Sequence, residues 1–143
     1  MKSTLFTIGF TKKSAEGFFS ILKNAGVKKI IDVRLRPESQ LSGFAKRRDL
    51  KYFLKVIDGI EYEYHEEFVT SPELLDEARR GEVTHEVAMK KYVDLIKSRE
   101  LTFKAADFDG GCLLCAEPDP NHCHRKALAE YLASRLPLKI VHL

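Results

Sequence analysis

Residues 112–125 read Cys-Leu-Leu-Cys-Ala-Glu-Pro-Asp-Pro-Asn-His-Cys-His-Arg, and this stretch contains both a strand and the start of a helix. The apolar run at its beginning, residues 112–117, is typical of a buried strand. The two prolines that follow prevent the strand from continuing, and Asn121 is a good helix N-cap. A helix is therefore predicted over residues 122–136. A strand that passes directly into a helix is the repeating unit of α/β proteins.

The rest of the chain repeats this alternation. Further strands are expected at residues 4–10, 28–35, 60–65 and 138–143, and helices at 15–25, 46–57, 72–81 and 85–99. We therefore predict an α/β fold, a three-layer sandwich with a mostly parallel central sheet flanked by helices. A chain of 143 residues is expected to form one domain over residues 1–143.

The composition indicates a soluble globular protein, with 44% apolar and 31% charged residues. No segment is long and apolar enough to span a bilayer, so no contact with a membrane is expected. The start of the chain runs directly into the first strand without a signal peptide, which favours a cytoplasmic location. In that compartment, three cysteines are more often catalytic, metal-binding or simply buried than part of a disulfide framework.

Ligands of open parallel sheets bind beyond the carboxyl ends of the strands. The candidate site residues are those predicted to follow strand ends or to begin the last helix. They are Thr11, Arg34, His65, Cys115, Glu117, Cys123, His124 and Arg125.

The chemistry of these residues suggests a thiol in an anion-binding pocket. Cys123 or Cys115 is the expected nucleophile or redox centre, and a helix N-terminus lowers the pKa of a thiol in its first turn. Glu117 or His65 is the expected acid/base. Guanidinium groups bind phosphate or carboxylate in a bidentate manner, which suits Arg34 and Arg125. Thr11 and His124 are the other residues expected to bind substrate. A cysteine-dependent transferase or hydrolase is one interpretation, with a small anionic ligand as its partner.

Other uses of the cysteines remain open. The spacing of Cys115 and Cys123 allows a disulfide between them. A zinc site is disfavoured, because Cys112 and Cys115 lie in a strand and point to opposite faces of it. No metal and no cofactor is predicted.

A basic stretch at residues 34–55 supports a second interpretation. It contains seven basic groups against Glu38 and Asp49, and it also contains the aromatic residues Phe44 and Tyr52. Cations track phosphates and aromatic rings stack on bases. The alternative function is therefore a non-catalytic module that binds nucleic acid or nucleotides through this stretch.

The chain resembles the DUF488 family, a domain of unknown function, over nearly its whole length. The residues that carry the resemblance are Thr7-Ile8-Gly9, Asp32-Val33-Arg34 with Pro37 and Ser39, Phe44, Ile60-x-Tyr62-x-x-His65, Leu114-Cys115-x-Glu117, Cys123-His124-Arg125 and Val141-His142. The family usually has His-Ser after the first glycine, whereas this chain has Phe10-Thr11. The resemblance implies an α/β fold and a shared site, and it implies no particular activity.

Overall fold

The computed structural model describes residues 2–38, 43–115 and 124–143. Its centre is a five-stranded sheet in the order β3-β2-β4-β1-β5, and all of its strand pairs are parallel. The strands are β1 (Ser3–Gly9), β2 (Lys29–Asp32), β3 (Glu61–Tyr64), β4 (Gly111–Cys115) and β5 (Leu138–His142). The helices are α1 (Ala15–Ala25), α2 (Arg47–Phe53), α3 (Pro72–Arg79), α4 (His85–Ser98) and α5 (His124–Arg135).

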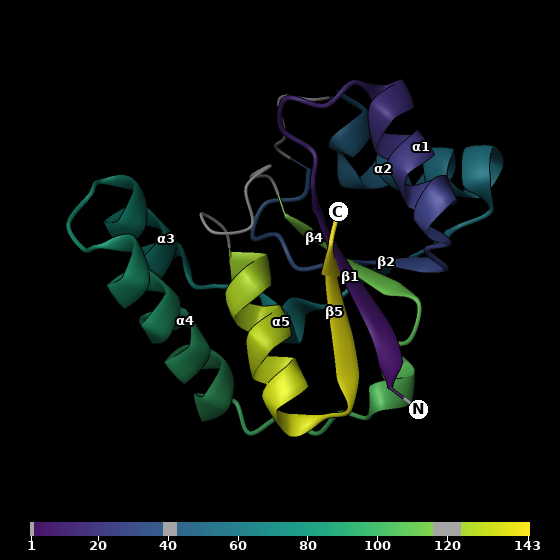
Figure 1. Ribbon diagram of the computed structural model, residues 1–143. Helices are drawn as coiled ribbons and strands as arrows, with labels where there is room; N and C mark the ends of the chain where they lie inside the picture. The colour runs from purple at the N-terminus through teal and green to yellow at the C-terminus, as the bar shows by residue number, and fades with distance from the viewer. Residues whose placement is uncertain (1, 39–42, 116–123) are drawn as a thin grey trace.

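Helices cover both faces of this sheet (Figure 1). On one face, Phe18 of α1 and Leu50 of α2 pack with Ile8 and Ile30 of the strands. On the other face, α5 and α4 pack against strand residues that include Leu113. The expected three-layer α/β sandwich is confirmed, and the sheet is parallel at every strand pair of the described chain.

Strand β4 lies at the centre of the sheet and is buried on both sides. Its first four residues are inaccessible to solvent, as expected of a continuous apolar run in a parallel sheet. Gly111 begins the strand where a side chain does not fit, because a Cβ atom there would lie 2.6 Å from Cδ1 of Ile31. The Ile31 side chain of β2 occupies the space beside Gly111.

The predicted helix starts are confirmed by hydrogen bonds to the backbone. The Ser14 hydroxyl accepts the amide of Gly17 at the start of α1, at 3.0 Å. The hydroxyls of Ser71 and Thr84 accept the corresponding amides in α3 and α4, each at 3.2 Å. These caps fix where each helix leaves its loop.

The helix predicted over residues 46–57 is not regular throughout. The α-helix ends at Phe53, and a π-helical turn, Leu54–Asp58, follows it. This turn leaves Val56 and Ile57 more than half exposed. Strand β2 is shorter than expected and ends at Asp32. Residues 101–108, for which the sequence favoured neither a loop nor a short helix, contain the 3₁₀ turn Ala105–Asp107.

None of the helices in the described part of the chain has the length and apolar character needed to cross a membrane.

Candidate active site

Arg125, in the first turn of α5, is fully buried at the carboxyl-terminal edge of the sheet. Its Nε donates a hydrogen bond to the hydroxyl of Thr7 in β1, at 3.3 Å. The same hydroxyl lies 2.5 Å from Nδ1 of His142 in β5. The three side chains therefore form a chain that joins the last helix to two neighbouring strands.

The protonated forms of two other bases are disfavoured around this guanidinium. Burial lowers the pKa of Lys13, and the charge of Arg125 lowers it further. The pKa of His142 is lowered by burial and then by Arg125 and Lys126. In the neutral tautomer without a proton on Nδ1, His142 accepts a hydrogen bond from the Thr7 hydroxyl. We name Thr7, Lys13, Arg125 and His142 the basic cluster. An anion placed among these groups would be stabilised by charge.

Cys115 lies beside this cluster, at the end of β4. It is level with Gly9 of β1, whose carbonyl accepts a hydrogen bond from Nζ of Lys13 at 2.7 Å. In this structure Cys115 is disulfide-bonded, whereas Cys112 is a free, buried thiol whose pKa burial raises. Cys123 lies outside the described residues, so the expected Cys115–Cys123 pairing stays a prediction. Glu117 also lies outside them.

Arg34 is held in a buried ion pair with Asp32. Nε of Arg34 donates to one carboxylate oxygen at 2.9 Å, and Nη2 donates to the other at 2.8 Å. Nη1 donates to the carbonyl of Ala45 at 2.6 Å, and the guanidinium carbon lies 5.5 Å from the centre of the Phe10 ring. Arg34 is only 6% exposed. Arg34 lies on the face of the sheet that α1 and α2 cover, whereas the Thr7 side chain that Arg125 contacts lies on the other face.

Two tyrosines of β3 complete the surroundings of this pair. The Tyr62 hydroxyl donates to Asp32 at 2.5 Å, and the Tyr64 hydroxyl donates to the carbonyl of Arg34 at 2.8 Å. Burial, and then the Asp32 carboxylate, raise the pKa of Tyr62. Asp32 also accepts the amide of Arg34, so it organises the backbone at the end of β2.

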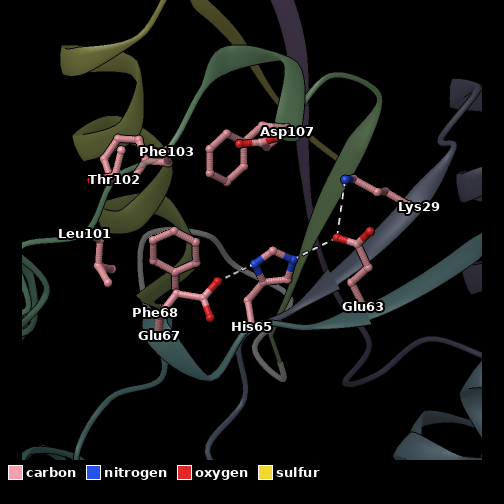
Figure 2. Close-up of a pocket in the computed structure, with 10 residues that line it drawn as sticks. Lys29, Glu63, His65, Glu67, Phe68, Leu101, Thr102, Phe103 and Asp107 are labelled. Carbon is pink, nitrogen blue, oxygen red and sulfur yellow. Dashed lines mark hydrogen bonds and ion pairs between the residues drawn. The ribbon is translucent and has the colours of Figure 1, made fainter.

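His65 follows β3 at the outer edge of the sheet and belongs to a different group of residues. Its two ring nitrogens lie 2.8 Å from Glu63 and 2.6 Å from Glu67 (Figure 2). Strand β2 separates β3 from β4, so His65 and Cys115 stand two strand spacings apart, about 10 Å. The structure does not bring His65 to the basic cluster.

The remaining candidates occupy two further places. His124 is largely buried, and its ring lies 4.7 Å from the Tyr92 ring in an edge-to-face arrangement. Burial, and then His85, lower the pKa of His124 to about 4. Thr11 lies in the turn after β1 and is partly exposed. Its hydroxyl forms no hydrogen bond with the described residues.

Sequence reasoning missed three members of the basic cluster: Thr7, Lys13 and His142. Thr7 is a polar residue within a buried strand, and that was the available signal. His142 is level with Thr7 in the neighbouring strand, which only the strand order reveals. Within residues 2–38, 43–115 and 124–143, no group of three or more His, Cys, Asp or Glu side chains is placed to hold a metal ion.

The comparison with known proteins identifies the family. No curated protein and no solved structure matches the chain. One family model, "Domain of unknown function DUF488", matches residues 14–132. This span includes α1 to α4, the Asp32–Arg34 pair, Cys115 and Arg125. The match covers well over half of the chain, and the protein therefore belongs to the DUF488 family.

Proposed function

We propose that this protein is an enzyme that binds a small phosphate- or carboxylate-bearing substrate at the basic cluster and acts on it through the thiol of Cys115. The observation that carries the proposal is the buried Arg125, which lies beside the end of β4 and adds to burial in lowering the pKa of both Lys13 and His142. An anion bound there would be attracted by the positive charges of Arg125 and Lys13. A cationic surrounding also favours a thiolate over a thiol, and the thiolate is the nucleophile.

The disulfide at Cys115 sets a condition on this chemistry, because a sulfur in a disulfide is not a nucleophile. A dithiol reductant would have to supply two electrons and two protons, and both sulfurs would leave as thiols. The oxidised protein is then the inactive form and the reduced protein the active one.

Neighbouring lysines provide a matched test of the anion site. Lys13 lies within reach of Arg125, whereas Lys12 is exposed. Calorimetric titration of the reduced protein with inorganic phosphate should show saturable binding. We expect Lys13→Gln to weaken it by about tenfold, the value of one charge-assisted contact, and Lys12→Gln to leave it unchanged. Absence of phosphate binding, or equal losses in the two variants, would refute the anion site.

A second candidate function is nucleic-acid binding at the surface of α2. Tyr52, Val56 and Ile57 are 62%, 55% and 51% exposed, which is unusual for such large apolar side chains. Exposed cations flank them at Arg48, Lys51 and Lys55. The exposed Tyr52 ring among cations favours stacking on a base of single-stranded nucleic acid.

Fluorescence anisotropy with a labelled single-stranded oligonucleotide tests this second function. Binding should weaken steeply with added salt, and Tyr52→Ala and Lys51→Gln should each reduce it. Lys90→Gln, which removes an exposed cation from α4, is the matched control. Binding that Lys90→Gln weakens as much as Lys51→Gln would mean general charge attraction and no defined surface.

A further inference from the structure

A pocket of about 490 Å³ opens against β3 and shares no described residue with the basic cluster. Three phenylalanines form its apolar walls: Phe68, Phe103 and Phe108. Their ring centres lie 6.0–6.3 Å from one another. Phe68 and Phe108 are almost completely buried, so the core of the protein holds them in place. A pocket with such walls is partly preformed.

The polar rim of this pocket is acidic (Figure 2). It contains the carboxylates of Glu63, Glu67 and Asp107, together with Lys29 and His65. Even with His65 protonated, the carboxylates outnumber the cations. The pocket therefore has the opposite charge preference from the basic cluster.

Lys29 and His65 do not saturate these carboxylates. Both bind the same oxygen of Glu63, Oε1, at 3.3 and 2.8 Å. Glu67 uses only Oε1, for His65, and Asp107 uses only Oδ2, for the amide of Lys104. In the described chain, the second oxygen of each of the three carboxylates accepts no hydrogen bond. These three oxygens remain available to a donor on a ligand.

The position of His65 fixes the geometry of this rim. Its ring stacks on Phe68, with the ring centres 5.9 Å apart and the planes 12° apart. The imidazole thus holds Glu63 and Glu67 at defined positions above an aromatic wall. His65 already lies between the two carboxylates, so a ligand ammonium group would lie beside the imidazole and donate hydrogen bonds to the second oxygen of Glu63 or Glu67.

From this geometry we propose that the pocket binds a small organic cation, an alkylamine whose ammonium group lies at the Glu63–Glu67 rim and whose hydrocarbon chain lies against Phe68 and Phe103. A metal ion is disfavoured, because no group of three ligating side chains is suitably placed among the described residues. An anion is disfavoured by the carboxylates. This inference is independent of the proposed thiol chemistry.

Three size-matched probes test the inference by NMR titration of the full chain: n-butylamine, n-butanol and n-butyrate. We expect saturable shifts of the Phe68, Phe103 and His65 ring signals with butylamine, weaker binding of butanol and none of butyrate. Glu67→Gln should weaken butylamine binding by about tenfold, because one charged hydrogen bond is lost.

Glu66→Gln is the matched control, because Glu66 is exposed beside Glu67 and does not line the pocket. It should leave the affinity unchanged. Three outcomes would overturn the inference: no saturable shift with butylamine, butyrate binding as tightly as butylamine, or equal losses of affinity in Glu66→Gln and Glu67→Gln.

Discussion

At the scale of single residues, Asp32 and Arg34 form an ion pair in which both side chains are buried. The Asp32 carboxylate is fully buried, and it accepts hydrogen bonds from two donors of the Arg34 guanidinium, from Tyr62 and from a backbone amide. Asp32→Asn would leave the guanidinium buried without its counter-charge. We expect the free energy of unfolding in urea to fall by about 3–5 kcal/mol.

Asp94→Asn, at an exposed position of α4, is the control and should change stability by less than about 0.5 kcal/mol. Equal stabilities of the two variants would show that the buried pair contributes nothing beyond its volume.

The hydroxyls of Tyr62 and Tyr52 allow a buried hydrogen bond to be compared with an exposed hydroxyl. Tyr62→Phe removes only the hydroxyl that donates to Asp32, and should reduce stability by about 1.5–3 kcal/mol, because the acceptor is charged. Tyr52→Phe removes a hydroxyl from an exposed ring and should change nothing measurable. Urea unfolding of both variants, measured side by side, checks the difference. A stable Tyr62→Phe protein would mean that solvent reaches Asp32.

His124 should make the protein less stable in acid. Its pKa is about 4 in the folded protein, against an ordinary value of 6.5, so the unfolded chain binds a proton at a higher pH than the folded one. The contribution of His124 to the free energy of unfolding is fully present above about pH 6.5. It is lost as the pH falls toward 4, by up to about 3 kcal/mol. Urea midpoints measured across this range in wild type, His124→Phe and His85→Asn test the assignment. The slope of stability against pH should flatten most in His124→Phe, and less in His85→Asn, because His85 is the smaller of the two causes that lower the pKa of His124. An unchanged slope in His124→Phe would show that other groups cause the loss of stability in acid.

Sequence reasoning found many of these residues but not all of their roles. A charged pair among aliphatic residues, Asp32 and Arg34, is visible in the sequence, and its partner Tyr62 lies on a strand that only the fold brings alongside. For the same reason, the sequence predicted that Arg34 faces a ligand, whereas its guanidinium donates to Asp32 and Ala45. The ligand role of Arg34 stays a prediction.

At the scale of elements, the helix caps follow from local chemistry. Ser14 accepts the Gly17 amide at the start of α1, so Ser14→Ala should destabilise the protein by about 1 kcal/mol. Ser20→Ala lies on the exposed side of the same helix and should be neutral or slightly stabilising. Thermal or urea unfolding distinguishes the two. A loss in both variants would point to a general intolerance of substitution in α1.

The irregular end of α2 illustrates what local sequence does not contain. The spacing of Leu50 and Leu54 suits a regular helix, and the sequence predicted one to residue 57. The π-helical turn ends at Gly59, which adopts the left-handed conformation with φ 65°, and the amide of Ile60 donates to the carbonyl of Leu54 at 3.0 Å. Helical periodicity of apolar residues does not report this change from α-helical to π-helical hydrogen bonding.

At the scale of the whole molecule, alternating strands and helices were sufficient to predict a parallel α/β sandwich, but the strand order was not predicted. The order β3-β2-β4-β1-β5 puts β2 between Cys115 and His65, and it aligns His142 with Thr7. The candidate residues that the structure describes therefore lie in separate places: Cys115 and Arg125 at the basic cluster, Arg34 in the buried pair with Asp32, and His65 at the acidic pocket. His124 and Thr11 lie apart from these three. Sequence periodicity assigns residues to faces of a strand, and only long-range pairing assigns strands to neighbours.

The central claim is that a reactive thiol at Cys115 lies within an anion site. The most direct measurement is the alkylation rate of Cys115 by iodoacetamide in the reduced protein, followed by peptide mass spectrometry with and without inorganic phosphate. The free, buried Cys112 is the internal control, and it should remain unmodified. We predict rapid alkylation of Cys115 at mildly acidic pH and clear protection by phosphate. Alkylation no faster than that of an ordinary cysteine, and unaffected by phosphate, would contradict the account.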